Sequence, residues 1–485
     1  MILITLNRIN AITTTSHNNN IHESVVIIGA GFAGIAAFNH LKKNGYTNVK
    51  LVEGSNRIGG RVFPFQYEDG YLQFGAQFIN GHNNPIYKMA HQLNLIFGEE
   101  MDDGLVYEGG YHFGKCQVPN SDLLKFTNFS KHLEKKYGNL AKDKANKHLT
   151  VGQLFQKDFN AFLLSEAFDE GTSNKHNFFE GLANVYKSYF ETEWASPINR
   201  LALQNLDQWD DEEGEMKSYT LDKFGYQKIL EHISLNISAD DIYLNSKVIN
   251  VDYSGTTKTQ ISLSNGVILE EIDKVISTIP LGHLKKYANS LFTPPLPKQK
   301  LSAIKRLGFG DMQKIFLIYE KPFWTDNADL IHAISLDGCT KTDVFSNIFQ
   351  TFGPLHWKNK HILVGWISGT GPSLLGQIDD AVIAQKCTEH FRIAFNNQLI
   401  PFPDSVIRKS WSTDDLFLGS YSFLTPESTN LPKDPYLIME TPIIKDKKLR
   451  IQFAGEATHS KMYQTVVGAY LSGQREADRM IRDVE

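Results

Sequence analysis

The sequence predicts an α/β fold in which a Rossmann-like domain with a parallel sheet, discontinuous in the sequence, carries an inserted α+β unit. Two glycine-rich turns predict the sheet, because each directly follows a short apolar run, one near residue 29 and the other near residue 455. The long stretch between them has helical periodicity and few such turns, which predicts the inserted unit. A length of 485 residues is enough for two or more hydrophobic cores.

Charge and cysteine content exclude several classes of protein. Lysine and arginine number 49 against 54 acidic residues, a net charge of −5, so nucleic acid is not an expected partner. The three cysteines, Cys116, Cys339 and Cys387, lie far apart in the sequence, so we expect neither a disulfide framework nor a metal site. We expect the protein to be in a reducing compartment. No apolar run is long enough for a membrane span.

The first strand and helix enclose a phosphate-binding pattern. Residues 24–28 form an apolar run typical of a buried parallel strand, and Gly29-Ala30-Gly31-Phe32-Ala33-Gly34 leads into a helical pattern. In such a turn Gly29 allows the bend, Gly31 lets a pyrophosphate approach and Gly34 allows close packing of helix on strand. A tight turn without a ligand is the alternative.

The second strand, residues 49–52, ends in Glu53, where an acceptor for an adenosine ribose hydroxyl belongs. An acid at this position argues against a preference for a cofactor that carries a 2′-phosphate on its ribose. The following Glu53-Gly-Ser-Asn-Arg57-Ile-Gly59-Gly60-Arg61 resembles the second glycine-rich segment of the flavin amine oxidases. The resemblance implies non-covalent FAD, a Rossmann-like domain of the glutathione-reductase type, and cofactor contacts by Arg57, Gly60 and Arg61. Solvated surface charge is the alternative for the arginines.

The end of the chain resembles the flavin-binding signature of animal spermine and acetylpolyamine oxidases. An apolar strand at 449–453 runs into Ala454-Gly455-Glu456, and a helix is expected over 468–481. The resemblance implies that Gly455 and Glu456 contact the cofactor and that Thr465 and Val466 lie beside the flavin ring. Expected strands at 247–251, 261–268 and 274–280 belong to the same domain, with the Val248 backbone at the adenine.

Lys314 is the expected catalytic residue. It stands directly before the apolar strand 315–318, and the stretch from 281 to 324 resembles the oxidases, whose lysine hydrogen bonds to flavin N5 through a water. A buried ammonium is costly, and such lysines can have a low pKa. A lysine that extends to solvent is the alternative.

Aromatic residues and three lost histidines define the expected substrate side. Tyr421, in Gly419-Ser-Tyr-Ser422, matches an aromatic ring in front of the flavin, and Ser420 stands where monoamine oxidases carry a flavin-linked cysteine. Animal polyamine oxidases usually have histidine at Gln77, Asn80 and Val467, so we expect a shifted amine preference, altered pH profile or weak turnover. The expected substrate contacts are Tyr421, Gln77, Asn80, His82, Tyr219, Tyr463 and Thr465, and Gln77, Phe78 and Trp411 are added to the cofactor contacts.

An acidic run surrounds Trp209. It is either a solvated surface or the rim of a site that attracts a polycation. Its members are Asp207, Asp210, Asp211, Glu212, Glu213 and Glu215.

The domain division expected from these signals is a disordered tail, 1–23; an FAD-binding domain, 24–85, 219–289 and 406–485; and a substrate domain, 86–218 and 290–405. The expected function is FAD-dependent oxidation of a small-molecule polyamine by O2 in the cytoplasm, since the chain lacks a peroxisomal ending and a clear signal peptide and has only a weak transit-like start. The alternatives are a histone-lysine demethylase and a flavin-binding protein without turnover.

Overall fold

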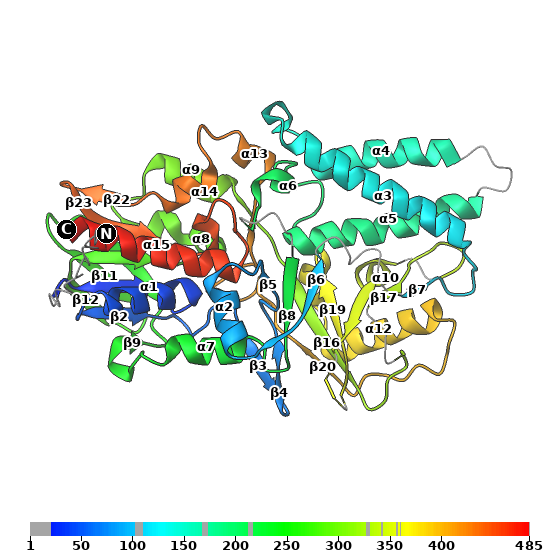
Figure 1. Cartoon of the computed structure of the whole chain (residues 1–485), viewed down its shortest axis with the longest axis horizontal. Coiled ribbons are helices and arrows are strands. Elements are labelled where there is room, and N and C mark those ends of the chain that lie inside the picture. The colour runs from blue at the N-terminus through cyan, green and yellow to red at the C-terminus, as the bar shows by residue number, and fades with distance from the viewer. Residues whose placement is uncertain are drawn as a thin grey trace, which may run out of the picture.

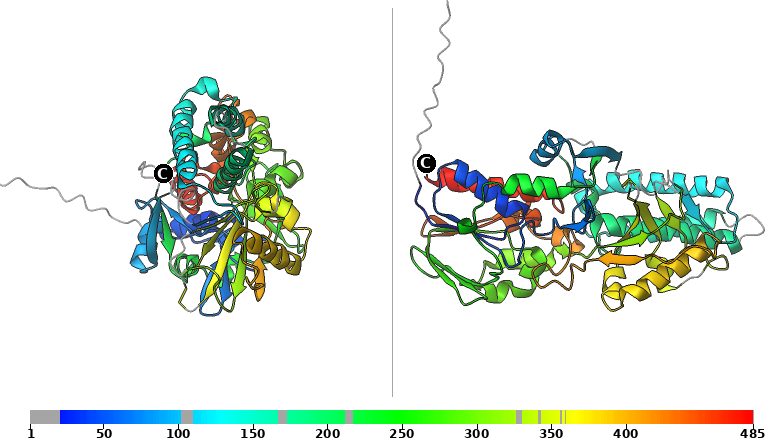
Figure 2. Two further views of the ribbon diagram at one scale, coloured as in Figure 1. Left: turned by 90° about the vertical axis from the view of Figure 1, so that its right-hand side faces the viewer. Right: turned by 90° about the horizontal axis from the view of Figure 1, so that it is seen from below.

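The computed structural model describes residues 21–101, 110–166, 173–211, 217–325, 330–340, 343–355, 357–358 and 360–484. The molecule is elongated, with a parallel sheet at one end and long helices at the other (Figures 1 and 2). Most of the expected tail lies outside the described residues. Its last part is ordered, because Ile21 bridges to Tyr46 and Glu23 lies 3.0 Å from Lys274.

A six-stranded sheet has the order β22-β23-β13-β1-β2-β9 and joins strands from both ends of the chain (Figure 1). All neighbouring strands are parallel except β22 and β23. The predicted strands at the start, middle and end of the chain are therefore confirmed. Their bounds are β1 Val25–Ile28, β2 Val49–Val52, β9 Ile242–Tyr243, β13 Lys274–Ser277, β22 Ile443–Lys445 and β23 Lys448–Phe453.

Other elements cover both faces of this sheet, which explains why β1 is apolar throughout. Val25 and Ile27 pack in one core with α1 (Phe32–Lys43) and α15 (Val466–Val484). Val26 and Ile28 pack in the opposite core with α8 (Leu281–Leu291) and α9 (Lys298–Arg306). The first and last helices lie side by side, blue and red in Figure 1.

A second six-stranded sheet, β20-β16-β19-β18-β17-β7, lies in the other half of the molecule. Its central strand alternates: Ile315, Leu317 and Tyr319 face α12, whereas Phe316 and Ile318 face Leu72 and Trp411. Lys314 shares this second face. The bounds are β7 Gly110–His112, β16 Gln313–Tyr319, β17 Ile331–Ala333, β18 Thr351–Pro354, β19 His361–Ile367, β20 Ser405–Arg408 and α12 Asp380–Ala394.

Three long helices, α3 (Asn120–Ala141), α4 (Val151–Glu166) and α5 (Ser173–Trp194), form the helical layer next to this sheet (Figure 1). Their shared core is largely aromatic and includes Phe126, Phe155, Phe179 and Tyr186. These four aromatic side chains thus build the core of the helical layer. No described helix is both long and apolar enough to pass through a membrane.

Smaller elements complete the fold. The sheet β12-β11-β10-β14 extends the parallel half, β5-β8-β6 joins the halves, and β3 pairs with β4 and β15 with β21. The strand bounds are β3 Pro64–Tyr67, β4 Gly70–Gln73, β5 Ile79–Asn80, β6 Ile96–Met101, β8 Lys217–Leu221, β10 Val248–Asp252, β11 Thr259–Leu263, β12 Ile268–Ile272, β14 Phe292–Thr293, β15 Gly308–Phe309 and β21 Ser422–Phe423. The helix bounds are α2 Pro85–Gln92, α6 Asn205–Gln208, α7 Tyr226–Ser234, α10 Val344–Ile348, α11 Gly371–Leu375, α13 Pro426–Thr429 and α14 Pro435–Glu440. We propose that the two domains divide at the bounds that the sequence predicts.

A disulfide joins Cys116 and Cys339, so the expectation of unpaired cysteines is wrong. The reason lies in the topology. Strands β7 and β17 are parallel neighbours, and each cysteine follows one of them by a few residues. Parallel strands end at the same edge, which brings two cysteines 223 residues apart into contact. Cys387 is free and buried in α12.

Candidate active site

A cavity of about 1070 Å³ extends from the glycine-rich turn after β1 to the helices α3 and α5 and the sheet around β16. Most expected cofactor contacts line it. They are Gly29, Gly31, Ala33, Glu53, Gly60, Arg61, Gln77, Phe78, Val248, Trp411, Gly455, Glu456, Thr465 and Val466. Ala30 and Gly34 lie directly beside this lining, in the same turn. No group of residues suited to a metal ion occurs within the described ranges.

The turn after β1 has the geometry of a phosphate cradle. Gly29 has a φ of +101°, which disfavours any side chain, and a Cβ on Gly34 would lie 1.9 Å from the Gly29 oxygen. Gly31 bridges to Gly59 in parallel, and a Cβ on Gly31 would have no protein atom closer than 3.8 Å. The space beside Gly31 is therefore open to a ligand, at the N-terminus of α1.

Glu53 is buried at the end of β2 and already accepts hydrogen bonds on both carboxylate oxygens. Its Oε2 accepts from the Ala30 backbone N–H at 2.8 Å, and its Oε1 accepts from both the backbone N–H and the hydroxyl of Ser55 at 2.8 Å. A second lone pair remains on Oε2. Glu53 therefore fixes the cradle and can still accept from a ribose hydroxyl.

The two arginines of the glycine-rich segment have different surroundings. The Arg57 guanidinium donates to the carbonyls of Ile58, Gly60 and Val62 and is not part of the cavity lining, so it holds the loop. Burial lowers the pKa of Arg57 to about 10. Arg61 faces the cavity, where its Nη1 donates to the Ser420 carbonyl and to Glu456 Oε1, both at 2.8 Å.

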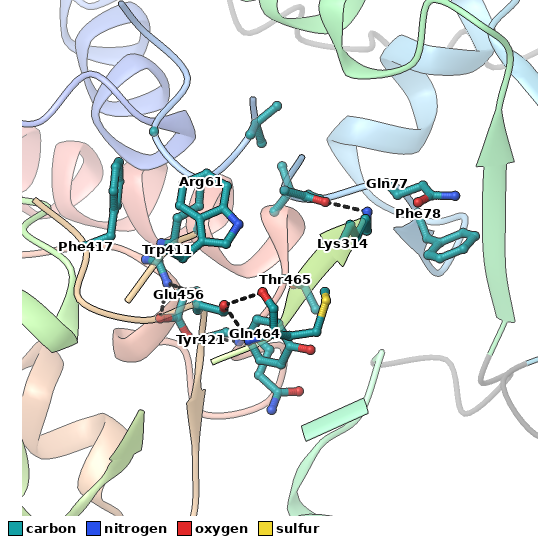
Figure 3. A pocket seen from close by; sticks show the side chains of 18 of the residues that line it. Arg61, Gln77, Phe78, Lys314, Trp411, Phe417, Tyr421, Glu456, Gln464 and Thr465 are labelled. Atoms are coloured by element: carbon teal, nitrogen blue, oxygen red, sulfur yellow. Dashed lines mark hydrogen bonds and ion pairs between the residues drawn. The ribbon is translucent and has the colours of Figure 1, made fainter. Parts of the chain in front are cut away.

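Glu456 connects the C-terminal segment to the rest of the site (Figure 3). Its side chain is buried, and its Oε2 accepts from Ser422 Oγ at 2.6 Å and from the Gln464 backbone N–H at 3.0 Å. Thr465, the residue after Gln464, is also held in place, because Thr465 Oγ1 donates to the Met462 carbonyl and accepts from the Gly468 N–H. One carboxylate thus fixes three separate segments at the cavity.

Lys314 projects from β16 into the cavity wall and is 3% exposed, which rules out a side chain that extends to solvent. Its Nζ donates to the carbonyls of Gly75 at 2.7 Å and Gln73 at 3.1 Å. Burial lowers the pKa of Lys314 from 10.5 to about 7. The residue can therefore gain or lose a proton near neutral pH.

The aromatic side of the cavity contains Trp411 and Tyr421 (Figure 3). Trp411 Nε1 donates to the Phe74 carbonyl at 3.2 Å, and the Tyr421 hydroxyl donates to the Thr192 carbonyl at 2.5 Å. Both rings are therefore held in place. Ser420 also lines the cavity and offers a hydroxyl where a covalent flavin link would need a thiol.

Strand alternation decides which of the remaining expected substrate contacts face the cavity. Strands β5 and β8 are antiparallel, with Asn80 opposite Ser218 and Ile79 opposite Tyr219. Asn80 and Ser218 line the cavity, whereas Tyr219 points to the other face and packs on Tyr87 at 4.6 Å.

His82 and Tyr463 are also outside the lining. The chain turns at Gly81, with a φ of +68°, which directs His82 toward Tyr219 at a ring distance of 6.4 Å. Tyr463 is fully buried and stacked on Tyr436 at 4.4 Å. Tyr219, His82 and Tyr463 therefore lie behind the cavity lining.

The acidic run does not form one continuous rim among its described members. Asp207 is exposed, Asp210 lies 3.7 Å from Lys461, and Asp211 is buried beside Gly81. Glu212, Glu213 and Glu215 lie outside the described residues.

Sequence reasoning missed the cavity wall formed by α3, α5 and the second sheet. Glu134, Glu193, His332 and Trp366 line it. Trp366 lies opposite Lys314 in the antiparallel pair β16/β19, so it shares the face of that residue. This pairing has no local sequence signal, because the strands are joined through a long connection.

The cavity fits a dinucleotide cofactor, because the cradle is open where a Cβ would fill it and both ends of the chain meet there. The family model of the flavin containing amine oxidoreductases matches residues 32–481. The human peroxisomal N(1)-acetyl-spermine/spermidine oxidase is 27% identical, with 94% of each chain covered.

Two other similar proteins differ in what they share with the chain. The human lysine-specific histone demethylase 2 is 31% identical over 95% of this chain but only 53% of its own length. A putrescine oxidase structure with bound putrescine has a TM-score of 0.67 at 17% identity, covering 95% of this chain and 99% of that one, and so shares the fold. The chain therefore belongs to the flavin containing amine oxidoreductases and is an enzyme that uses non-covalently bound FAD.

Proposed function

We propose that this enzyme oxidises polyamines. The carbon next to a secondary amine of spermine, spermidine or an acetylated polyamine loses two electrons, the resulting imine is hydrolysed to an aldehyde and a shorter amine, and O2 is reduced to H2O2. One observation carries the proposal: the cavity that begins at the cofactor cradle passes Lys314 and continues to a wall with the carboxylates of Glu134 and Glu193.

Two carboxylates in this wall favour a polycation over a simple amine. Glu134 comes from α3 and Glu193 from the last turn of α5, so the negative charge lies on the helical side of the cavity. A substrate with several ammonium groups can place one of them there while another nitrogen lies near Lys314. The similarity to an N(1)-acetyl-spermine/spermidine oxidase supports the same class.

Lys314 is suited to hold one proton at the reaction site. A neutral amine has two N–H groups, and here the two carbonyls of Gln73 and Gly75 accept from Nζ. Its lone pair is then left for the cavity. The protonated form instead presents a third N–H to the cavity, so one atom can accept or donate a proton, directly or through water.

Tyr421 and the residues around it orient the amine. Its ring is fixed by the bond from its hydroxyl to Thr192 and offers a flat face to the substrate chain. FAD, when bound, supplies the two-electron redox chemistry and its reoxidation by O2. Arg61, Glu53 and the open space at Gly31 would hold it at the other end of the cavity.

The purified flavoprotein with spermine, N1-acetylspermine, spermidine and a monoamine provides the test. We expect H2O2 release and bleaching of the flavin absorbance under anaerobic conditions with at least one polyamine and much less with the monoamine. A flavin that stays oxidised with every polyamine would contradict the proposal and favour a flavin-binding role without turnover.

Histone-lysine demethylation is the second candidate, because the human demethylase is 31% identical over nearly all of this chain. Mono- and dimethylated histone H3 peptides test it. Formaldehyde release from a peptide, with no peroxide from free polyamines, would establish the demethylase in place of the polyamine oxidase.

A further inference from the structure

We propose that Trp194, Trp209, Glu193 and Gln464 form a subsite for an ammonium group of the substrate other than the nitrogen being oxidised. All four line the cavity. This inference rests on the proposed function and narrows it to amines with a second charged nitrogen.

Two indole rings form the walls of this subsite. Trp209 Nε1 donates to the Tyr463 carbonyl at 3.1 Å, and the Trp194 ring lies 6.3 Å from the Tyr463 ring. Tyr463 is itself fixed by its stack on Tyr436 and by a bond from its hydroxyl to Asn205 at 3.1 Å. The buried Tyr463 therefore sets the position of two half-buried tryptophans, whose π faces attract cations more strongly than other aromatic side chains do.

Gln464, the next residue, has an unfavourable conformation. Its φ is +73°, a value that side chains other than Asn and Asp seldom adopt, and its backbone N–H is held by Glu456. Its side-chain amide makes no hydrogen bond within the described part of the chain, although Nε2 is buried. Strain and an unsatisfied polar group at one cavity residue point to a ligand. In Figure 3 the Gln464 side chain extends away from Lys314.

Glu193 supplies the charge. Its side chain is exposed, and it directly precedes Trp194 in the sequence. Burial is the main cause that raises the pKa of the Tyr421 hydroxyl, and the charge of Glu193 is the second. The carboxylate therefore lies near Tyr421. Rotation of the Gln464 amide about its last torsion would place Oε1 where Nε2 lies, so that a carboxylate, two indole faces and an amide carbonyl together recognise an ammonium. An acetylated nitrogen has no charge and would gain little from the carboxylate or the indole faces.

Non-substrate probes separate this proposal from the proposed function. The binding of 1,8-diaminooctane and of 1-aminooctane to the holoenzyme is measured by calorimetry, since neither has a secondary amine. We expect the diamine to bind at least about tenfold more tightly. Trp194→Leu, Trp209→Leu and Glu193→Gln should each weaken the diamine by roughly three- to thirtyfold and leave the monoamine within twofold.

Three further variants complete the design. Trp194→Phe keeps an aromatic face and should recover most of the affinity, while Trp357→Leu, an indole that contacts Gly70 outside the cavity lining, should change neither probe. Gln464→Gly removes the strain and the amide together, so its thermal midpoint should rise while diamine binding weakens. Equal losses for both probes, or full diamine affinity in the folded leucine and glycine variants, would overturn the subsite even if polyamines are oxidised.

Discussion

Arg61 and Glu456, 395 residues apart in the sequence, form an ion pair with 2.8 Å between Nη1 and Oε1. Because Glu456 also accepts from Ser422 and from the Gln464 backbone, this pair ties the first glycine-rich segment to the last one. The cofactor cradle is therefore closed by a contact between the two ends of the chain.

Glu456→Gln should destabilise the protein by about 3 kcal/mol, since it removes the charge of one member of a largely buried ion pair. Urea unfolding measures the loss, and the ratio of flavin to protein absorbance after gel filtration should fall as well. Glu427→Gln, at an exposed acid, is the control and should change neither quantity. Unchanged stability and flavin content in Glu456→Gln would show that the pair does not hold the cradle.

Lys314→Met should lower the rate of flavin reduction by about a hundredfold, in the range of a lost proton-transferring group. Because burial brings the pKa of Lys314 to about 7, the wild-type rate should show a limb near neutral pH that the variant lacks. Stopped-flow measurements with a polyamine from pH 6 to 9 test both. An identical pH profile in the variant would remove the assigned role.

The same substitution should stabilise the fold, and by more at low pH. Between pH 7 and 10.5 the unfolded chain holds a proton on Lys314 that the folded chain does not, so wild-type stability gains about 1.4 kcal/mol per pH unit there. The methionine variant has no such gain. Its advantage in the free energy of unfolding should therefore be largest below pH 7 and shrink toward pH 10, and an advantage that grows with pH would contradict the assignment.

Gly29→Ala should lower the stability of the fold, whereas Gly31→Ala should weaken FAD binding. A Cβ on Gly29 would lie 2.3 Å from Thr278 Oγ1 at a φ of +101°, so this variant should lose stability even without FAD. A Cβ on Gly31 meets no protein atom closely but projects into the cradle, so that variant should fold normally and bind FAD at least tenfold more weakly. Thermal unfolding of the apoproteins and flavin titration separate the two effects.

Cys339→Ser should lower stability by about 2 to 4 kcal/mol, because the bond closes a loop of 223 residues. Denaturant unfolding under non-reducing conditions measures it. Wild-type protein treated with a reductant should match the variant, and a reductant effect on the variant itself would show that another bond is responsible.

Local patterns were sufficient to predict the parallel half of the fold. The four apolar residues of β1 predict a buried strand, and the prediction is correct because both faces of the strand are covered. The turn after β1 has a glycine pattern that lies within six residues. Lys314 is assigned mainly from the resemblance of residues 281–324 to the flavin amine oxidases, and its place directly before an apolar strand supports the assignment. Such signals need no knowledge of distant contacts.

Features that depend on strand pairing could not be read from the sequence. Cys116 and Cys339 meet only because β7 and β17 are neighbours. Tyr219 turns away from the cavity because of its partner Ile79, and Trp366 faces it because of its partner Lys314. Trp194 and Trp209 come together through Tyr463, which is more than 250 residues away from either.

The place of β23 and α15 in the sheet has a consequence for biosynthesis. A ribosome makes the cradle glycines long before their partners in the sheet and helix layer, residues 448 to 484. The growing chain can fold its helical half while β13 still lacks its neighbour β23. The cradle is therefore complete for FAD binding only after β23 and α15 have left the ribosome.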